Sequence, residues 1–202
     1  MKFSSKRHIV IICTSLVVLM GFYLYLSKLN KNHHKDINLP IRFVESNYAI
    51  WNNVDELFEY ADLVVVGKPL LDIEESAKRT SEIDHRVADF YSLTPFQISQ
   101  VLKGGHEGPE VTVIQPAAVF FEENGEKFIL ANEDYTPMIP GLKYILFLKN
   151  TNIGAYSIIA INQGKHNVDD RDRYEKDIKR KNKQLSQLHE QVMNKYKDKI
   201  KS

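Results

Sequence analysis

The sequence predicts an α+β protein that is held to a membrane by one N-terminal helix. Three observations lead to this class: an apolar run near the N-terminus, about six or seven short strand-like segments in the middle, and a charged helical pattern at the C-terminal end. Short strands at close spacing, with turn residues between them, are typical of a small barrel or sandwich. We therefore expect a transmembrane helix, a small, mostly antiparallel β-domain with a short leading helix, and a charged C-terminal helix.

The apolar run covers residues 9–26 and contains no charged side chain. At a rise of about 1.5 Å per residue, a helix of this length just crosses a hydrocarbon core of about 30 Å. The run is longer than the apolar core of a signal peptide, and no small-x-small cleavage site follows it, so we predict an uncleaved anchor. Cys13, the one cysteine of the chain, lies inside the run and is interpreted as a small apolar side chain, not a lipidation site.

The charges that flank the run do not decide its orientation, because three basic residues precede it and three follow it. A short cytoplasmic N-terminus with an exported body is the commoner arrangement. The expected location is therefore the cell membrane, with a single span and an extracytoplasmic C-terminal domain. The expected segments are a cytoplasmic N-terminus (1–8), the anchor (9–26), a polar linker (27–41), the β-barrel domain (42–168) and a basic helix (169–202).

The formal net charge of +1 conceals three zones. Residues 1–35 carry +6, residues 36–170 carry −11 and residues 171–202 carry +6. An acidic domain with basic ends does not favour nucleic acid as a partner. The basic C-terminal segment can lie on anionic lipid, where each Lys or Arg contributes about 1 kcal/mol, or it can be a solvated, charged helix. Both readings stay open at this point.

The first element of the β-domain is a short helix that begins after Asn53, a good N-cap residue, with Glu56 at the capping-box position. Its apolar residues fall on one helical face: Val54, Leu57, Phe58 and Ala61. A buried strand is predicted next, over 63–66, because the run is apolar and rich in β-branched residues. Residues 72–86 are charged and lack alternation, so they are predicted to form a loop or a loose helix.

Further strands are predicted over 90–102, 111–115, 144–148 and 156–161. Between the second and third of these lies a hairpin over 119–130, with Asn124-Gly125 as a two-residue type I′ turn. With that turn, three residue pairs would face each other across the strands, one of opposite charge and two apolar: Glu122 with Lys127, Phe121 with Phe128, and Phe120 with Ile129.

From Arg171 to the end of the chain the pattern is helical. A thin apolar stripe runs along it: Tyr174, Ile178, Leu185, Leu188, Val192, Tyr196 and Ile200. So thin a stripe needs a partner to hold the helix in water. Docking on its own domain and self-association through this helix are the two alternatives.

Five stretches carry a family resemblance: ADLVVVGKPL (61–70), FQISQVLKGG (96–105), VTVIQP (111–116), GLKYILFLK (141–149) and YSIIAINQGK (156–165). Together they cover about residues 55–165, and they resemble small bacterial membrane-anchored extracytoplasmic proteins. Their order looks like the netrin-type, OB-like barrel that tissue metalloprotease inhibitors also use. The resemblance implies an OB-like barrel, but a shared fold alone does not establish a function. Those inhibitors depend on an N-terminal cysteine that is missing here, so none of their functional residues carries over.

No catalytic residue, cofactor or metal site is predicted. The chain has no H-E-x-x-H and no G-x-S-x-G, and its cysteine is assigned to the anchor. The neighbouring His33 and His34 lie in the polar linker without further ligands and are interpreted as solvated.

Two segments are candidates for contact with a partner. Residues 135–140 would form an exposed apolar loop, with Tyr135 and Met138 as its contact residues. Polar groups close the last strand, and among them Gln163, Lys165 and His166 are candidate partner-binding residues.

These observations predict a membrane-anchored, extracytoplasmic binding or assembly module without catalytic activity. Its partners would be the membrane and either another protein or a second copy joined through the C-terminal helix. The alternative is an inhibitor or immunity-type protein that acts on a secreted protease or toxin. A third hypothesis is a hydrolase or metal enzyme whose site brings together four distant residues: Asp84, His85, His106 and His166.

Overall fold

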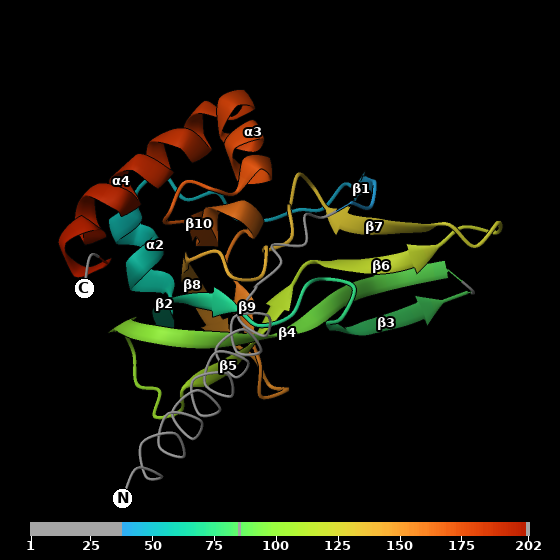
Figure 1. Ribbon diagram of the computed structural model, residues 1–202, viewed down its shortest axis with the longest axis horizontal. Coiled ribbons are helices and arrows are strands. Elements are labelled where there is room, and N and C mark those ends of the chain that lie inside the picture. Colours follow the sequence, from blue (N-terminus) through green and yellow to red (C-terminus); the bar gives the residue numbers. More distant parts are fainter. Residues whose placement is uncertain (1–37, 85, 201–202) are drawn as a thin grey trace, which may run out of the picture. The chain divides into compact units, whose positions relative to one another are not determined.

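Five strands close into a barrel in the computed structural model, which describes residues 38–84 and 86–200 (Figure 1). The strands are β2 (Leu63–Pro69), β4 (Arg86–Lys103), β5 (Glu110–Gln115), β8 (Tyr144–Asn150) and β9 (Tyr156–Ile158). Around the barrel the order is β2, β4, β5, β9 and β8, and β8 pairs again with β2. Within this barrel β5 and β9 are parallel, and the other neighbouring pairs are antiparallel. The predicted α+β class and the small barrel are confirmed.

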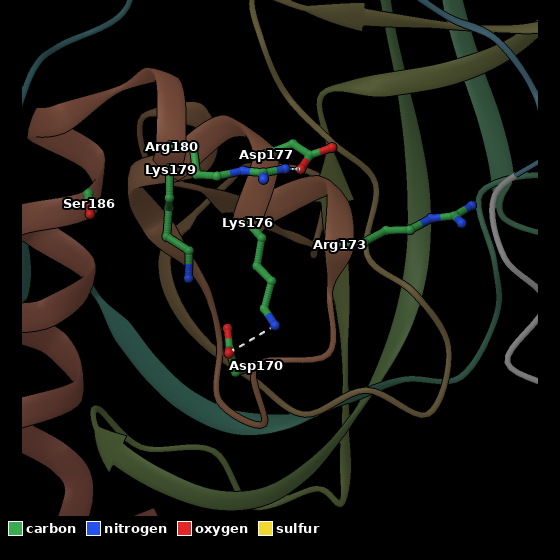
Figure 2. Close-up of a pocket in the computed structure, with 7 residues that line it drawn as sticks. All are labelled: Asp170, Arg173, Lys176, Asp177, Lys179, Arg180 and Ser186. Atoms are coloured by element: carbon green, nitrogen blue, oxygen red, sulfur yellow. Dashed lines mark hydrogen bonds and ion pairs between the residues drawn. The ribbon is translucent and has the colours of Figure 1, made fainter.

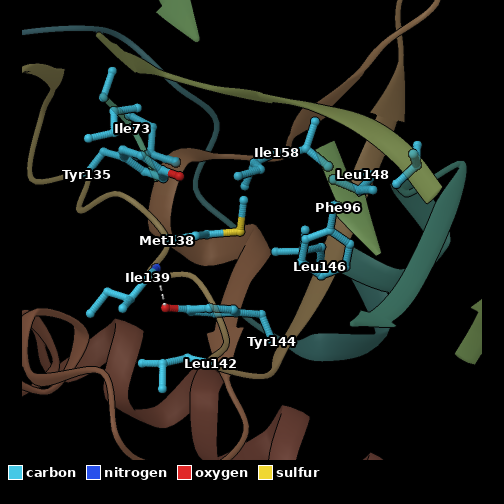
Figure 3. Packing of buried hydrophobic residues seen from close by; sticks show 14 of the residues in the cluster. Ile73, Phe96, Tyr135, Met138, Ile139, Leu142, Tyr144, Leu146, Leu148 and Ile158 are labelled. Atoms are coloured by element: carbon cyan, nitrogen blue, oxygen red, sulfur yellow. Dashed lines mark hydrogen bonds between the residues drawn. The ribbon is translucent and has the colours of Figure 1, made fainter. Parts of the chain in front are cut away.

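The strand β2 separates two hydrophobic cores. Successive side chains of a strand point to opposite faces, so Leu63 and Val65 lie in the barrel interior. Phe96 and Tyr144 belong to the same core (Figure 3). Val64 and Val66 point the other way, into a second core under the helices. Each of the four β2 residues from Leu63 to Val66 is at most 1% exposed. Burial on both faces explains why this strand is an unbroken apolar run instead of an alternating one.

The segment 72–86, predicted to be a loop or loose helix, contains the strand β3 (Ala77–Ile83), which runs antiparallel along β4. The prediction was wrong because all seven residues of β3 are exposed, so neither face carries an apolar alternation. A separate sheet of three strands has the order β1-β7-β6. Its members are β1 (Ile41–Val44), β6 (Ala117–Phe121) and β7 (Lys127–Asn132).

The hairpin between β6 and β7 is present, but its register differs by one residue from the prediction. Phe121 lies opposite Lys127 and Phe120 opposite Phe128. The amide of Gly125 donates to the carbonyl of Glu122, and Gly125 has a φ of 84°. The loop therefore has three residues, a turn followed by a left-handed glycine, and not the two residues of a type I′ turn.

The helix α2 (Val54–Tyr60) begins where the capping signal predicted. Asn53 Oδ1 accepts hydrogen bonds from the amides of Asp55 at 3.0 Å and Glu56 at 2.9 Å. Val54 and Leu57 are buried in the second core.

The strand predicted over 156–161 ends at Ile158. Ala160 and Ile161 take left-handed backbone conformations, with φ of 48° and 59°, and lead into the 3-10 helix η1 (Ile161–Gly164). The chain then forms β10 (Lys165–Asn167), which pairs with β8 on the edge opposite β2. A strand cannot continue through two residues with left-handed backbone conformations. The sequence pattern does not reveal that these two residues adopt them.

Two helices, not one, make up the C-terminal segment: α3 (Arg173–Lys181) and α4 (Lys183–Ile200). They are separated at Asn182, whose Oδ1 accepts a hydrogen bond from the amide of Leu185 at 3.0 Å. The stripe of α4 is buried, and Leu188, Val192, Tyr196 and Ile200 pack in the second core. Docking on the chain's own domain is confirmed for this stripe; self-association through the helix stays a prediction.

Across residues 38–84 and 86–200, every helix is too short or too polar to cross a membrane. The predicted anchor at 9–26 and the pair His33 and His34 lie outside this part of the chain, so the anchor stays a prediction.

Candidate functional site

The five side chains predicted to contact a partner are all buried. Tyr135, Met138, Lys165 and His166 are 0% exposed, and Gln163 is 7% exposed. The expectation of an exposed apolar loop at 135–140 is therefore wrong, since this loop covers the barrel interior (Figure 3). A role of these residues in partner contact stays a prediction, and their observed place is inside the framework.

A buried amide fixes the loop. Gln115 Oε1 accepts hydrogen bonds from the Tyr135 hydroxyl at 2.8 Å and from the Met138 amide at 2.9 Å. The Gln115 side-chain nitrogen donates to Thr94 Oγ1 at 2.6 Å. A buried, hydrogen-bonded network of this kind makes the surrounding core more rigid.

Lys165 is buried because its ammonium group has partners inside the fold. Its Nζ donates to the carbonyl and to Oγ1 of Thr136, and it lies 5.0 Å from the ring centre of Tyr135. Gln163 Oε1 accepts a hydrogen bond from the Trp51 amide at 2.8 Å, which ties the chain before α2 to η1. Both polar residues therefore hold segments of the fold together.

His166 and His189 meet between β10 and α4, with ring centres 5.5 Å apart. His166 Nε2 lies 2.8 Å from the carbonyl of Gln163, whereas its Nδ1 is buried without a partner among the described residues. Burial lowers the pKa of His166 well below its usual value and lowers the pKa of His189 to about 4. His189 Nδ1 is 3.4 Å from Glu175 Oε1 but without hydrogen-bond geometry. Burial therefore favours the neutral form of both rings.

The exposed feature next to this cluster is a basic concavity of about 500 Å³ between α3 and α4. Four cationic side chains, two carboxylates and one hydroxyl line it: Arg173, Lys176, Lys179, Arg180, Asp170, Asp177 and Ser186 (Figure 2). Three of the cations project from one face of α3, at helical spacing i, i+3 and i+7. Lys176 Nζ pairs with Asp170 Oδ2 at 2.9 Å, and Arg180 pairs with Asp177. Lys179 Nζ lies 3.4 Å from Oε1 of the buried Glu175. Counted with that carboxylate, the four cations and three acids leave a formal excess of one positive charge.

Buried carboxylates hold α3, and hence the basic concavity, against the barrel. Asp172 caps the helix, because its Oδ1 accepts from the amides of Tyr174 and Glu175, while its Oδ2 accepts from the Tyr144 hydroxyl at 2.9 Å. Glu175 is 1% exposed, and its oxygens accept from the Asn167 amide at 2.9 and 3.0 Å. Burial raises the pKa of Glu175, whereas the neighbouring lysines oppose that rise.

The four residues of the enzyme hypothesis are not brought together as a set. His106 lies in the β4–β5 turn, where its Nε2 is 2.8 Å from the carbonyl of Glu110, whereas His166 lies beside His189. Asp84 is in the β3–β4 turn, and His85 is outside the described residues. Within 38–84 and 86–200, no group of three or more His, Cys, Asp or Glu side chains is placed to hold a metal ion.

No family model, curated protein or solved structure matches the chain. The resemblance to netrin-type domains therefore stays a prediction.

Sequence reasoning found the basic character of the C-terminal segment but not the concavity. The concavity requires the bend at Asn182 and the burial of Glu175, an acidic residue that a sequence pattern assigns to the solvated face.

Proposed function

We propose that this protein is a membrane-anchored, extracytoplasmic binding or assembly module without catalytic activity, whose basic concavity contacts an anionic lipid surface. The observation that carries this proposal is the cluster of Arg173, Lys176, Lys179 and Arg180 in one open concavity. Residues 36–170 carry −11, so the positive charge of the chain is concentrated at its two ends. Cationic side chains near an anionic bilayer contribute about 1 kcal/mol each.

The packing supports a preformed surface. Leu188, Val192 and Tyr196 fix α4 on the second core. Asp172 and Glu175 fix α3. The cations therefore project from elements whose backbone is already ordered, so binding does not have to order the chain. An anchor at 9–26 would keep the domain close to the bilayer, which raises the effective concentration of the concavity at that surface.

We further propose that the barrel is OB-like. Two observations support this proposal: the barrel has five strands in the order β2, β4, β5, β9 and β8, and β8 pairs again with β2 to close it. This fold has many functions, so it adds no activity to the proposal.

The inhibitor or immunity-type alternative requires an exposed apolar loop. Tyr135 and Met138 are buried, so no observation on that loop favours it.

The test is flotation of the fragment His34–Ser202 with vesicles of phosphatidylglycerol or phosphatidylcholine. This fragment is one compact unit that contains both hydrophobic cores. We expect binding to phosphatidylglycerol alone, and a weakening by about 30-fold or more in Arg173→Glu/Arg180→Glu, since each cation contributes about 1 kcal/mol and reversal adds repulsion.

The matched control is Lys127→Glu/Lys149→Glu, which changes the net charge equally on β7 and β8 and should bind as the unchanged fragment does. Equal binding to both lipids, or equal losses in the two double variants, would contradict a specific role of the basic concavity.

A further inference from the structure

The strand β3 has one paired edge and one open edge. It pairs with β4 from Ala77 opposite Leu93 to Ile83 opposite Arg86, and no other described strand pairs with it (Figure 1). All seven of its residues are exposed, including Ile83 at 67%. An open edge presents a row of backbone donors and acceptors, and such a strand is a template for another one.

The outer edge of β3 is also regular. The pairing of β3 with β4 shifts between Ser81 and Glu82, but the extra residue, Ala88, lies in β4. The strand itself therefore runs without a bulge over its seven residues, and it contains no proline. Two common devices that block edge pairing, a bulge in the edge strand and a proline, are absent from β3.

We infer that β3 pairs antiparallel with β3 of a second copy of this chain, centred on Thr80. In a two-fold symmetric antiparallel pair, the central residue lies opposite itself. Thr80 is the middle residue of β3, so this register pairs all seven residues. It places Lys78 opposite Glu82 of the other copy, and the symmetry repeats that ion pair.

The remaining pairs of this register, which include Arg79 opposite Ser81, set no like charges opposite each other. Ala77 lies opposite the exposed Ile83 of the second copy, and Thr80 lies opposite Thr80, which is a favourable cross-strand pair. A register centred on Arg79 would set two guanidinium groups opposite each other. A register centred on Ser81 would lose two of the seven pairs and leave Glu82 opposite Thr80.

Charge therefore selects the partner. The strand β3 has two basic residues near one end, Lys78 and Arg79, and an acidic residue, Glu82, near the other. Its charges therefore repel a parallel copy and attract an antiparallel one. Pairing would join the two β3–β4 hairpins into one continuous four-stranded ribbon. Two-stranded ribbons are marginal on their own, so both copies gain order from the contact. The inference gives one form to the assembly role proposed above, but it does not involve the basic concavity, so either can fail alone.

The first test is cysteine crosslinking of the full chain in intact cells, with Cys13→Ser as the background. Thr80→Cys places two thiols opposite each other, so mild oxidation should give a disulfide-linked dimer. The matched control is Ala77→Cys, whose two copies would be offset by six residues, about 20 Å. Equal crosslinking at both positions, or none at Thr80→Cys, would overturn the inference.

The second test exchanges the charges in the Thr80→Cys background. Lys78→Glu alone sets Glu opposite Glu twice, and Glu82→Lys alone sets Lys opposite Lys, so each should reduce crosslinking by about tenfold. Both changes in one chain should restore it, and so should co-expression of the two single variants, because unlike copies are then complementary.

Lys78 also has an intramolecular contact, since its Nζ lies 4.5 Å from the ring centre of Phe120. Recovery of crosslinking in the double variant distinguishes the loss of the cross-strand ion pairs from the loss of this contact. In the double variant that contact is lost, yet the cross-strand ion pairs return. If both single variants crosslink as well as the parent, or if the double variant stays as low as the single variants, the register is wrong.

Discussion

Replacement of Tyr144 by Phe tests how the barrel positions α3. The Tyr144 hydroxyl accepts a hydrogen bond from the Ile139 amide at 3.0 Å (Figure 3). It donates to Asp172 Oδ2 at 2.9 Å. It therefore joins the loop that covers the barrel to the N-cap residue of α3. Tyr144→Phe removes one oxygen and keeps the ring, so the apolar packing changes little.

The expected loss of stability follows from the two hydrogen bonds of the Tyr144 hydroxyl. The Ile139 amide would be left buried without a partner, which costs about 1–3 kcal/mol, and Asp172 would lose one bond to a charged acceptor, worth about 1.5–3 kcal/mol. Asp172 keeps its bonds to the amides of Tyr174 and Glu175 through Oδ1, so we expect a total in the lower half of the summed range, about 2.5–4 kcal/mol. For a domain of this size that lowers Tm by about 5–16 °C.

The assay is urea unfolding, followed through Trp51, the only tryptophan. It packs against the second core, so its fluorescence should report loss of the fold. Hydrogen exchange at the amides of Tyr174 and Glu175 should accelerate in the variant, because the N-cap is less well held. Tyr91→Phe, at a half-buried position of β4, is the control and should cost less than 1 kcal/mol. A loss below 1 kcal/mol for Tyr144→Phe, or unchanged exchange at the start of α3, would refute this account of the link.

Three further changes test other parts of the fold. Burial keeps His189 neutral with a pKa of about 4, whereas the unfolded chain titrates near 6.5. The unfolded state therefore binds more protons between these values, so His189 should weaken folding by up to about 3 kcal/mol as pH falls from 6.5 to 4. His189→Gln should make the unfolding free energy, measured in urea, less dependent on pH, although His166, whose pKa burial also lowers, still acts in the same direction. An unchanged pH dependence would count against it. Gly67→Ala should lower the free energy of unfolding by about 1–3 kcal/mol in thermal melts, since its Cβ would lie 2.0 Å from the Gln97 carbonyl oxygen. Gly105→Ala is the control and should not lower it, because a Cβ there would meet no atom within 4 Å. Asn53→Ala should cost about 1 kcal/mol by loss of the cap, and Asn53→Asp close to none, in the same melts; equal losses would argue against capping.

The sequence pattern predicted those elements whose local signals agree with the tertiary structure. Leu63–Val66 is apolar because both of its faces are buried, and Asn53 caps a helix in the fold as it would in a peptide. The strand β3 escaped prediction because its pairing with β4 leaves every side chain exposed, so periodicity carries no signal. The hairpin register was off by one residue because Asn-Gly is compatible with a three-residue loop as well as a two-residue one.

The candidate site was less predictable, because several polar side chains that the sequence pattern places at the surface are buried in the core. Lys165 and His166 look like surface residues in the sequence, but Thr136, Tyr135 and the carbonyl of Gln163 give them partners inside the fold. The cations of the basic concavity were recognised only as net charge. Their placement around one concavity depends on a bend at Asn182 and on the docking of α3, which are tertiary effects.

The most direct test of the central claim is photocrosslinking of the full chain in intact cells, from a photoreactive residue in place of Lys176. That position lines the basic concavity, whereas Lys127, on the β6–β7 hairpin, serves as the reference position. We predict adducts with anionic phospholipid from position 176 and far fewer from position 127. Equal labelling of lipid from both positions, or adducts from position 176 with protein alone, would contradict the claim that the basic concavity contacts the bilayer.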